Sequence, residues 1–299
     1  MTQAQKFREL LHSKSLIQAP GAYDAITAKL IEKAGFEAVY ITGSGISLSL
    51  LGQPDLNTVS YLEVRERVNT LLSTIQIPMI VDIDTGFGGP LNIVRLVRDF
   101  ERMGVAAVQI EDQRSPKRCG HELNRHLVAP EEMIQRIRAI VESRSGKDGL
   151  AVIARTDART SLGVQEAIRR AHAYLKAGAD VVFVESPESI QEVCQICKGI
   201  PAPVLFNNVE GGRSPFMTRQ ELVDAGVKIV IYPNTLTRVA VKSCQKILEE
   251  LKNTGTTMGG RGDMLDHKEI WKLFDDKMWL DLESKYTYIP RKEADQNET

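Results

Sequence analysis

The 299-residue sequence lacks several features that define common protein classes. It has only four cysteines, too few and too scattered for a disulfide framework. No run approaches the roughly 18 apolar residues of a membrane span, and no G-x-G-x-x-G motif follows the first predicted strand. Lysine and arginine number 38 against 39 aspartates and glutamates, so the net charge of −1 provides no overall attraction for nucleic acid.

The N-terminal stretch adds a further absence. MTQAQKFRELLHSKS contains no apolar core of a secretory signal. We therefore expect a soluble cytoplasmic protein with neither a membrane nor a nucleic-acid partner, although the mildly positive N-terminus leaves organelle import open. The length could hold two domains, but α/β barrels commonly run to about 200–250 residues as one domain.

What the sequence does contain is one pattern repeated eight times: a short apolar, β-branched run followed by an amphipathic stretch. Such runs are typical of strands that are buried on both faces of a parallel sheet. Several amphipathic stretches end on a glycine just before the next run, which is typical of a helix C-cap. The predicted strands are residues 16–20, 38–43, 79–84, 106–112, 150–157, 181–186, 203–208 and 228–233.

Eight strand–helix units predict a (β/α)8 barrel, with an open doubly wound sheet as the alternative. Residues 238–255 and 267–286 provide more helix than the eighth unit needs, and the second segment carries two tryptophans and a phenylalanine. Those side chains would pack either on the barrel or on another subunit. We predict one barrel domain over residues 1–288 and a disordered polar tail over 289–299.

Acidic residues follow two of the predicted strands. Asp82 and Asp84 end one run, and because side chains alternate along a strand, both carboxylates point the same way. Glu111 ends the next run, and in a barrel all strand ends meet at one face. Such an oxygen-rich cluster suits Mg²⁺, with Mn²⁺ as the alternative metal. The competing interpretation is that these acids cap helices or pair with arginines.

Other polar residues lie after the remaining strands. Arg155 offers a planar fork for a substrate carboxylate, unless it serves only as a partner of the acids. Glu185 and Asn207 end the sixth and seventh runs, Arg238 follows the eighth, and Asp55 lies in the loop after the second. We expect these side chains to face one active site at the carboxyl end of the barrel.

The stretch DQRSPKRCGH, after the fourth run, places Cys119 close to Lys117, Arg118 and His121. Nearby positive charge lowers the pKa of a thiol, and a thiol that exchanges its proton near neutral pH can act as an acid or a nucleophile. The residues alone leave an incidental loop cysteine as an equal alternative. The C-Q-I-C stretch at 194–197 has no second cysteine pair, so it predicts helix packing instead of a zinc or redox site.

Four motifs together resemble the isocitrate lyase / phosphoenolpyruvate mutase superfamily: VDIDTGFGGPLN, AVQIEDQ with PKRCGH, ARTDAR, and NNVEGGRSP. The resemblance runs from PGAYDA to ESKYT. The K-R-C-G-H block is typical of the carbon–carbon lyases of this superfamily, whereas the phosphonate mutases typically lack its cysteine. The resemblance implies a (β/α)8 barrel whose last helical segment, about residues 236–288, exchanges between subunits of a homotetramer.

The resemblance also implies which residues form the site. Those it assigns to catalysis are Cys119, Tyr40, Arg155, Glu185, Lys117 and His121. Those it assigns to substrate binding are Thr42, Gly43, Ser44, Arg118, Gly120, Asn207, Glu210 and Arg238. Those it assigns to one Mg²⁺, partly through water, are Asp82, Asp84, Glu111 and Asp55.

In the implied reaction, a small di- or tricarboxylate with a 2-hydroxy group is cleaved between C2 and C3. Tyr40, assisted by Arg155 and Glu185, would remove the hydroxyl proton, and Mg²⁺ would stabilise the developing charge. Cys119 would protonate the carbanion of the second product. The loop that carries the thiol would close as a lid, with Gly120 supplying the backbone freedom.

Two departures from the methylisocitrate lyases bear on the substrate. Those enzymes tend to read N-[IM]-T-E-F-G-x-T-P where this chain reads NNVEGGRSP, and they tend to carry an arginine where it has His267. Both departures favour a smaller 2-alkylmalate of the dimethylmalate lyase group, with 2-methylisocitrate next. The residues also leave open a phosphoenolpyruvate mutase-type isomerase, an oxaloacetate hydrolase and a non-catalytic binding protein.

Overall fold

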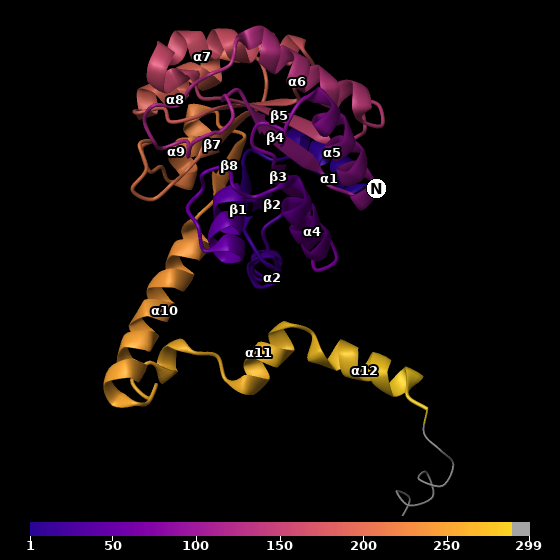
Figure 1. Ribbon diagram of the computed structural model, residues 1–299, viewed down its shortest axis with the longest axis vertical. Coiled ribbons are helices and arrows are strands. Elements are labelled where there is room, and N and C mark those ends of the chain that lie inside the picture. Colours follow the sequence, from indigo (N-terminus) through magenta and orange to yellow (C-terminus); the bar gives the residue numbers. More distant parts are fainter. Residues whose placement is uncertain (289–299) are drawn as a thin grey trace, which may run out of the picture. The chain divides into compact units, whose positions relative to one another are not determined.

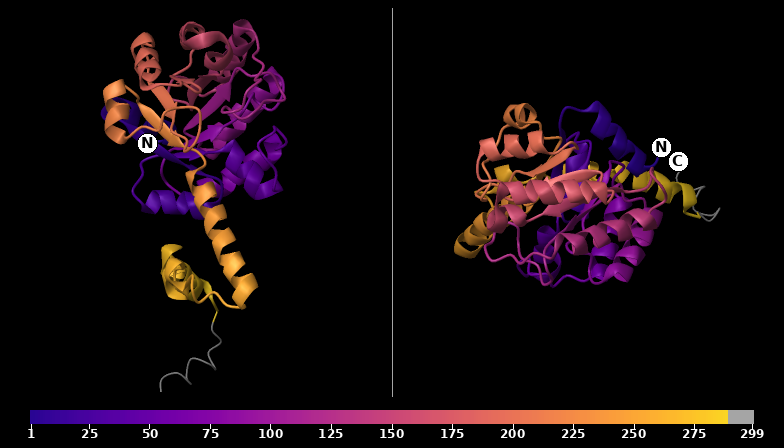
Figure 2. Two further views of the ribbon diagram at one scale, coloured as in Figure 1. Left: turned by 90° about the vertical axis from the view of Figure 1, so that its left-hand side faces the viewer. Right: turned by 90° about the horizontal axis from the view of Figure 1, so that it is seen from above.

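The computed structural model describes residues 1–288, and the predicted polar tail over 289–299 lies outside the described residues. Within residues 1–288, eight parallel strands close into a barrel in chain order, with helices around it (Figures 1 and 2). The (β/α)8 prediction is therefore confirmed, and each strand overlaps one predicted run. The strands are β1 (Ile17–Ala22), β2 (Val39–Ile41), β3 (Met79–Asp82), β4 (Ala107–Glu111), β5 (Ala151–Thr156), β6 (Val181–Val184), β7 (Val204–Asn207) and β8 (Ile229–Tyr232).

The barrel closes because the last strand pairs with the first. β8 lies parallel to β1, with Ile17 opposite Ile229 and Pro20 opposite Tyr232. Helical segments precede, connect and follow the strands. They are α1 (Gln3–Ser13), α2 (Ala25–Lys33), α3 (Gly43–Ile46), the π-helical η1 (Ser47–Leu51), α4 (Tyr61–Leu72), α5 (Pro90–Met103), α6 (Pro130–Ser143), α7 (Ala158–Lys176), α8 (Ile190–Gly199), α9 (Arg219–Ala225) and α10 (Thr235–Thr254).

The helix ends follow from local sequence chemistry. α4 begins at a capping box, in which the side chains of Ser60 and Glu63 each accept a hydrogen bond from the other's backbone N–H. α5 begins with Pro90 at its first turn and ends at Gly104, whose φ of 90° lies in the left-handed region that favours glycine. Gly226 ends α9 in the same way, with a φ of 88°. The predicted glycine stops are confirmed at these two helix ends.

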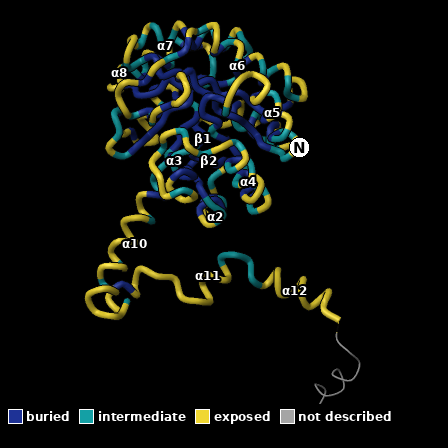
Figure 3. The backbone as a smooth tube through the Cα atoms, viewed as in Figure 1, coloured by how far each residue is buried: buried dark blue, intermediate teal, exposed yellow. Residues whose placement is uncertain are grey.

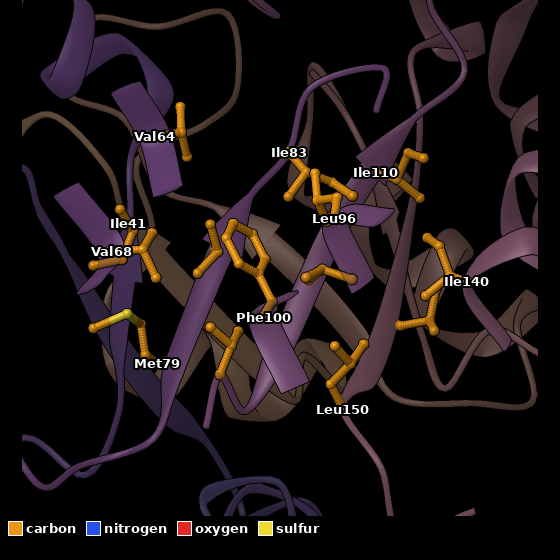
Figure 4. Packing of buried hydrophobic residues seen from close by; sticks show 14 of the residues in the cluster. Ile41, Val64, Val68, Met79, Ile83, Leu96, Phe100, Ile110, Ile140 and Leu150 are labelled. Carbon is orange, nitrogen blue, oxygen red and sulfur yellow. The ribbon is translucent and has the colours of Figure 1, made fainter. Parts of the chain in front are cut away.

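Two layers of apolar side chains hold the barrel together. The inner layer lies within the barrel and includes Tyr40, Ile153 and Phe183. The outer layer lies between strands and helices and includes Phe100 and Ile140 (Figure 4). Because both faces of the strands are covered, nearly every strand residue is buried (Figure 3). This double burial explains why the strands appear in the sequence as continuous apolar runs.

Helix α1 covers the amino end of the barrel. Phe7 and Leu11 pack into the inner layer, and Phe7 is fully buried. Arg8 forms an ion pair with Asp180, the residue just before β6, at 2.8 Å, and also donates to the backbone oxygen of Gly149 just before β5. The site residues therefore face the opposite, carboxyl end of the strands.

The chain forms two compact units, Met1–Ala240 and the part from Val241 onward. The second unit contains the rest of α10, followed by η2 (Arg261–Asp263), α11 (His267–Leu273) and α12 (Asp276–Tyr286). The single helix predicted over 267–286 is wrong, because Asp275 adopts a φ of 60° and separates α11 from α12. The prediction of one domain over residues 1–288 stays a prediction.

The second unit presents apolar side chains to solvent. Trp271 and Trp279 are 53% and 64% exposed, and α11 and α12 contain no buried residue (Figure 3). The two tryptophans help to line a cavity of about 520 Å³ between these short helices. Exchange of this segment between subunits stays a prediction. In the described part of the chain, no helix is long and apolar enough to cross a membrane.

Candidate active site

The predicted site residues gather at the carboxyl ends of the strands, where they line a cavity of about 50 Å³. Thirteen of the eighteen line it: Tyr40, Thr42, Ser44, Asp55, Asp82, Lys117, Arg118, Cys119, Gly120, His121, Arg155, Glu185 and Asn207. The sequence did not indicate the remaining lining residues: Phe183, Val209, Ile231, Pro233 and Asn234. Most side chains of the cavity wall thus come from the strand ends and from the loop after β4.

The acid cluster lies at the ends of β3 and β4. Asp82 Oδ1 accepts hydrogen bonds from the backbone N–H of Asp84 and from Gln109 Nε2, both at 3.1 Å. Burial, together with the charge of Asp84, raises the pKa of Asp82 to about 6. Burial also raises the pKa of Glu111, even though Arg155 acts in the opposite direction. Negative charge is therefore poorly compensated here.

The cluster has the oxygen donors and the space that a cation needs. Within residues 1–288, Glu111 Oε1 is a buried carboxylate oxygen without a hydrogen-bond partner. A Cβ on Gly43 would lie 3.5 Å from Asp82 Oδ2 and 3.6 Å from Asp84 Oδ1, so the absence of a side chain leaves space beside both oxygens on this side. A void of about 10 Å³ lies beside these residues, near the size that one water or ion needs. An oxygen-only donor set of this kind fits a hard divalent cation.

Lys117 lies inside the same cluster. Its buried ammonium is 2.6 Å from Asp55 Oδ1 and 2.8 Å from Asp84 Oδ1. Burial alone would lower the pKa of Lys117, but Asp84 and Asp55 raise it well above its ordinary value. Among the described residues, no three histidine, cysteine or acidic side chains converge as a ready-made metal site. The lysine ammonium instead lies between two of the predicted metal-binding acids.

Arg155 is both the predicted fork and a partner of the acids. Its Nε and Nη2 donate to the carboxylate of Asp157 at 3.0 and 2.9 Å. Glu111 and Glu185 lie 3.4 Å from its guanidinium, and the ring of Phe183 lies 5.1 Å from its central carbon. Arg155 therefore pairs with the acids and also lines the cavity, where its guanidinium is available to a substrate carboxylate.

The loop after β4 closes the cavity, and we call residues 113–126 the lid. The lid's two ends are joined where the Arg114 backbone N–H donates to the oxygen of His126 at 2.7 Å. Ser186 donates to the backbone oxygen of Gly120 at 2.9 Å, which fixes the lid to the end of β6. His121 Nδ1 accepts from the backbone N–H of Arg213 at 3.2 Å. The lid is seated on the loops that follow β6 and β7.

Cys119 corrects one expectation from the sequence. Burial raises the pKa of its thiol, whereas neighbouring cations were expected to lower it. The reason is geometric: Lys117 is paired with the acids, Arg118 is exposed, and burial lowers the pKa of His121, which favours its neutral form. The thiol faces both the small cavity and an open cleft of about 840 Å³, which is lined by the lid, the segment after β2 and the start of α10. It is therefore protonated at neutral pH, as a proton donor needs to be.

Tyr40 donates a hydrogen bond to Gln109 Oε1 at 2.5 Å. Burial, followed by the charge of Asp82, raises the pKa of Tyr40 well above its ordinary value. Gln109 lies two positions before Glu111 on β4, so strand alternation could have revealed that it points inward as well. Asn207 Nδ2 donates to Glu185 Oε2 at 3.2 Å, which joins the ends of β7 and β6.

Three predicted substrate-binding residues do not line the small cavity: Gly43, which lies beside the acids, Glu210 and Arg238. Glu210 accepts a hydrogen bond from Thr235 Oγ1 at 2.6 Å, and its backbone oxygen accepts one from Arg238. Arg238 lines the open cleft beside the lid and not the small cavity. Glu210 and Arg238 tie the loop after β7 to the start of α10.

Two comparisons bear on what kind of protein has this site. The sequence profile of a family described as Phosphoenolpyruvate phosphomutase matches residues 7–252. The chain belongs to this family. As a phosphoenolpyruvate phosphomutase family member, it is similar to the 2,3-dimethylmalate lyase of Eubacterium barkeri, with 45% identity over 94% of this chain and 96% of that protein. It is 42% identical to the 2-methylisocitrate lyase of Halalkalibacterium halodurans, over 93% of this chain and 92% of that protein.

The fold of this family member also matches solved structures. An oxaloacetate acetylhydrolase in complex with the inhibitor 3,3-difluorooxalacetate superposes with a TM-score of 0.90 at 33% identity, covering 95% of this chain and 97% of that one. The predicted superfamily is confirmed. The prediction of a carbon–carbon lyase is confirmed at the level of the family branch, because both sequence relatives carry lyase names.

Replacing Gly120 by alanine should prevent the lid from seating. A Cβ at this position would lie 2.4 Å from Arg155 Nη2 and 2.7 Å from Glu185 Cδ, too close for either side chain to remain in place. We expect turnover to fall about 100-fold, the scale set by a misplacement near 1 Å. Thermal unfolding should change little, because the lid residues do not belong to the apolar layers that hold the barrel together.

Steady-state kinetics and a thermal melt check this prediction. Gly262→Ala is the matched control, because a Cβ there meets no atom within 4 Å. Full turnover in Gly120→Ala would show that this close approach is not needed for activity.

Proposed function

We propose that the protein is a Mg²⁺-dependent carbon–carbon lyase. Its substrate is a 2-hydroxy dicarboxylate of the substituted-malate type, which it cleaves to a 2-oxo acid such as pyruvate and a second carboxylate. The observation that carries the proposal is a small cavity beneath the lid in which a thiol of raised pKa faces a guanidinium and an acid cluster. The lyase names of its relatives support it.

Charge balance supports the divalent cation. The carboxylates that meet here are Asp55, Asp82, Asp84, Glu111, Asp157 and Glu185, and the cationic side chains that they contact or face are Lys117, Arg125 and Arg155. Three negative charges are left over when all six acids are ionised. Asp82, Asp84 and Glu111 would hold Mg²⁺, with Mn²⁺ as the alternative and Asp55 as a further acid. The ion would supply positive charge beside the oxygens of the substrate.

The chain's own groups would bind and orient the substrate. Arg155 and Asn207 line the cavity and would receive one carboxylate, the guanidinium through charge-assisted hydrogen bonds. Thr42 and Ser44 line the opposite side, with Gly43 beside the acids, and would receive the other carboxylate. The seated lid excludes water, which strengthens these interactions.

Proton transfer would involve Tyr40 and Cys119. Tyr40 would accept the proton of the C2 hydroxyl, with Arg155 and Glu185 nearby. Burial and the negative charge of Asp82 disfavour the phenolate, so this role requires the charge of a bound cation. As the C2–C3 bond breaks, its electron pair passes to C3, which takes the proton of the Cys119 thiol.

The relatives and two features of the sequence support an assignment of the substrate. Two of the similar relatives are a 2,3-dimethylmalate lyase and a 2-methylisocitrate lyase, only three percentage points of identity apart. The stretch NNVEGGRSP and the presence of histidine in place of arginine at position 267 favour the smaller dicarboxylate. We therefore assign a 2,3-dialkylmalate as the preferred substrate and 2-methylisocitrate as the second candidate.

A product-release assay tests the proposed function. We expect the highest kcat/KM with 2,3-dimethylmalate among that compound, 2-methylisocitrate, isocitrate and oxaloacetate. Activity should disappear after dialysis against EDTA and return with Mg²⁺, because the acid cluster depends on a divalent cation. Faster turnover of phosphonopyruvate than of any malate would assign an isomerase instead. Undiminished activity after complete removal of metal would overturn the metal dependence.

Replacing Cys119 by serine should remove the proton donor and leave substrate binding largely intact. We expect kcat to fall by roughly 100- to 10,000-fold, the range for a general acid, with a small change in KM. The raised pKa of the thiol keeps it protonated through neutral pH, so the wild-type kcat should decline on the alkaline side only above about pH 9, the ordinary thiol value. Cys119→Ser should lack that decline.

The pH dependence of kcat for the two proteins checks this assignment. Cys244→Ser, at an exposed position on α10, is the control and should match the wild type. A Cys119→Ser enzyme with wild-type kcat would rule out the thiol as proton donor.

We also propose a homotetramer in which the segment of about residues 236–288 packs on a neighbouring subunit. The exposed indoles of Trp271 and Trp279 support this, because large apolar side chains are seldom left together in solvent. Light scattering should give four times the chain mass of 33.3 kDa, and Trp279→Glu should lower that mass. A monomer at micromolar concentration would contradict the proposal.

A further inference from the structure

Asp157 does not play the role that its position suggests. It is the residue before the first turn of α7, where an aspartate ordinarily accepts a hydrogen bond from the backbone of its own helix, yet its side chain makes no such bond. The carboxylate, which is fully buried, instead holds two guanidinium groups, those of Arg155 and Arg125. Both arginines contact the same oxygen, Oδ1.

The two arginines belong to different parts of the site. Arg155 is the penultimate residue of β5 and lines the cavity, whereas Arg125 is part of the lid. Arg125 is itself buried, and its second nitrogen, Nη2, donates to the hydroxyl of Thr160 in the first turn of α7. Asp157 is therefore shared between a lid residue and a residue that faces the cavity.

The backbone of Asp157, which carries the shared carboxylate, is held in place by Asp112. The backbone N–H of Asp157 donates to Asp112 Oδ1 at 2.9 Å. The other oxygen of Asp112 accepts from Thr156 Oγ1 at 2.7 Å, Arg170 Nη1 at 3.0 Å and Tyr174 Oη at 2.7 Å. A residue whose backbone is anchored in this way cannot follow the lid when it lifts, so lid opening separates Arg125 from Asp157.

The separation changes what Arg155 experiences. With the lid seated, one negative charge is shared between two guanidinium groups. With the lid raised, Asp157 faces Arg155 alone and compensates its charge more fully, which leaves less attraction for a substrate carboxylate. Glu111 and Glu185 also face Arg155. At 3.4 Å they are too far from its guanidinium for strong hydrogen bonds, so Asp157 remains its main partner.

We propose that Asp157 is a positioning residue that couples lid seating to the anion-binding strength of Arg155, through its shared contact with Arg125. The role of Arg155 in binding a carboxylate rests on the proposed function, whereas the dependence of the lid on Arg125 does not. A purely structural ion pair would stabilise the lid or the fold without altering Arg155.

Two measurements on Arg125→Gln, Asp157→Asn and the double variant separate these cases. The first is the rate at which N-ethylmaleimide alkylates Cys119 without ligand, followed by peptide mass spectrometry. Cys194, which lines an open groove on α8 outside the segment proposed to pack on a neighbouring subunit, serves as the internal reference. The second is the Kd of oxalate, a planar dianion with two carboxylates, at fixed Mg²⁺. Arg102→Gln, which removes a 77% exposed arginine, is the matched charge control.

We expect each single variant to speed Cys119 alkylation by at least about tenfold, because each removes the same buried contact, and the double variant to be no faster. Oxalate should bind at least about tenfold more weakly to Arg125→Gln. It should bind more tightly to the double variant than to Arg125→Gln, because the charge that withdraws Arg155 is gone. Arg125→Lys, which keeps the charge but not the fork, should fall between wild type and Arg125→Gln.

Either of two results would overturn the coupling. Unchanged alkylation in Arg125→Gln would show that the lid does not depend on this contact, whatever the substrate of the enzyme is. Multiplicative losses of oxalate affinity in the double variant would show two independent structural roles. If Asp157→Asn does not fold, Thr160→Val takes the place of that variant in the alkylation measurement, because it removes the second hydrogen-bond partner of Arg125. There, a rate unchanged from wild type in both Thr160→Val and Arg125→Gln counts against the proposal.

Discussion

Negative charge that burial leaves only partly compensated is the constraint on which the site depends. Carboxylates converge at the carboxyl ends of the strands, where little water remains to stabilise them. The pKa values of Asp82 and Glu111 rise for that reason. Arg155 meets this charge from β5, and Lys117 meets it from the lid. Charge compensation thus determines where the lid rests and which ligands the cavity accepts.

The lid links that compensation to chemistry. Lys117 and Cys119 lie two residues apart, so a lid held by its buried ammonium also fixes the position of the thiol. The same burial raises the pKa of Cys119 and keeps its proton available. At the far end of the lid, Arg125 connects to the carboxylate that holds Arg155. The lid therefore carries the ammonium of Lys117, the proton donor Cys119 and, in Arg125, the residue proposed to link lid seating to Arg155.

The strands and most of the site could be predicted from the sequence, because burial on both faces leaves unbroken apolar runs and a barrel gathers all strand ends at one face. The raised pKa of Cys119 could not be predicted from the sequence. The positive charges near it along the chain do not reveal that Lys117 pairs with the acids instead. Asp157 was missed for a similar reason: its position before a helix suggests a cap, and only the fold places Arg125 beside it. The break between α11 and α12 at Asp275 could not be predicted either, because no glycine or proline marks it in the sequence.

The packing of α1 against the amino end of the barrel has a consequence for traffic through the enzyme. With Phe7 fully buried in the inner layer, small molecules have no second route through the barrel axis. Substrate, products and water then all pass through the one opening beneath the lid, at the carboxyl end of the barrel, so they must pass in turn. The lid opening that releases the first product also lets water reach the second product. The lifetime of the closed state then sets both the speed of turnover and how cleanly the carbanion is protonated before water arrives.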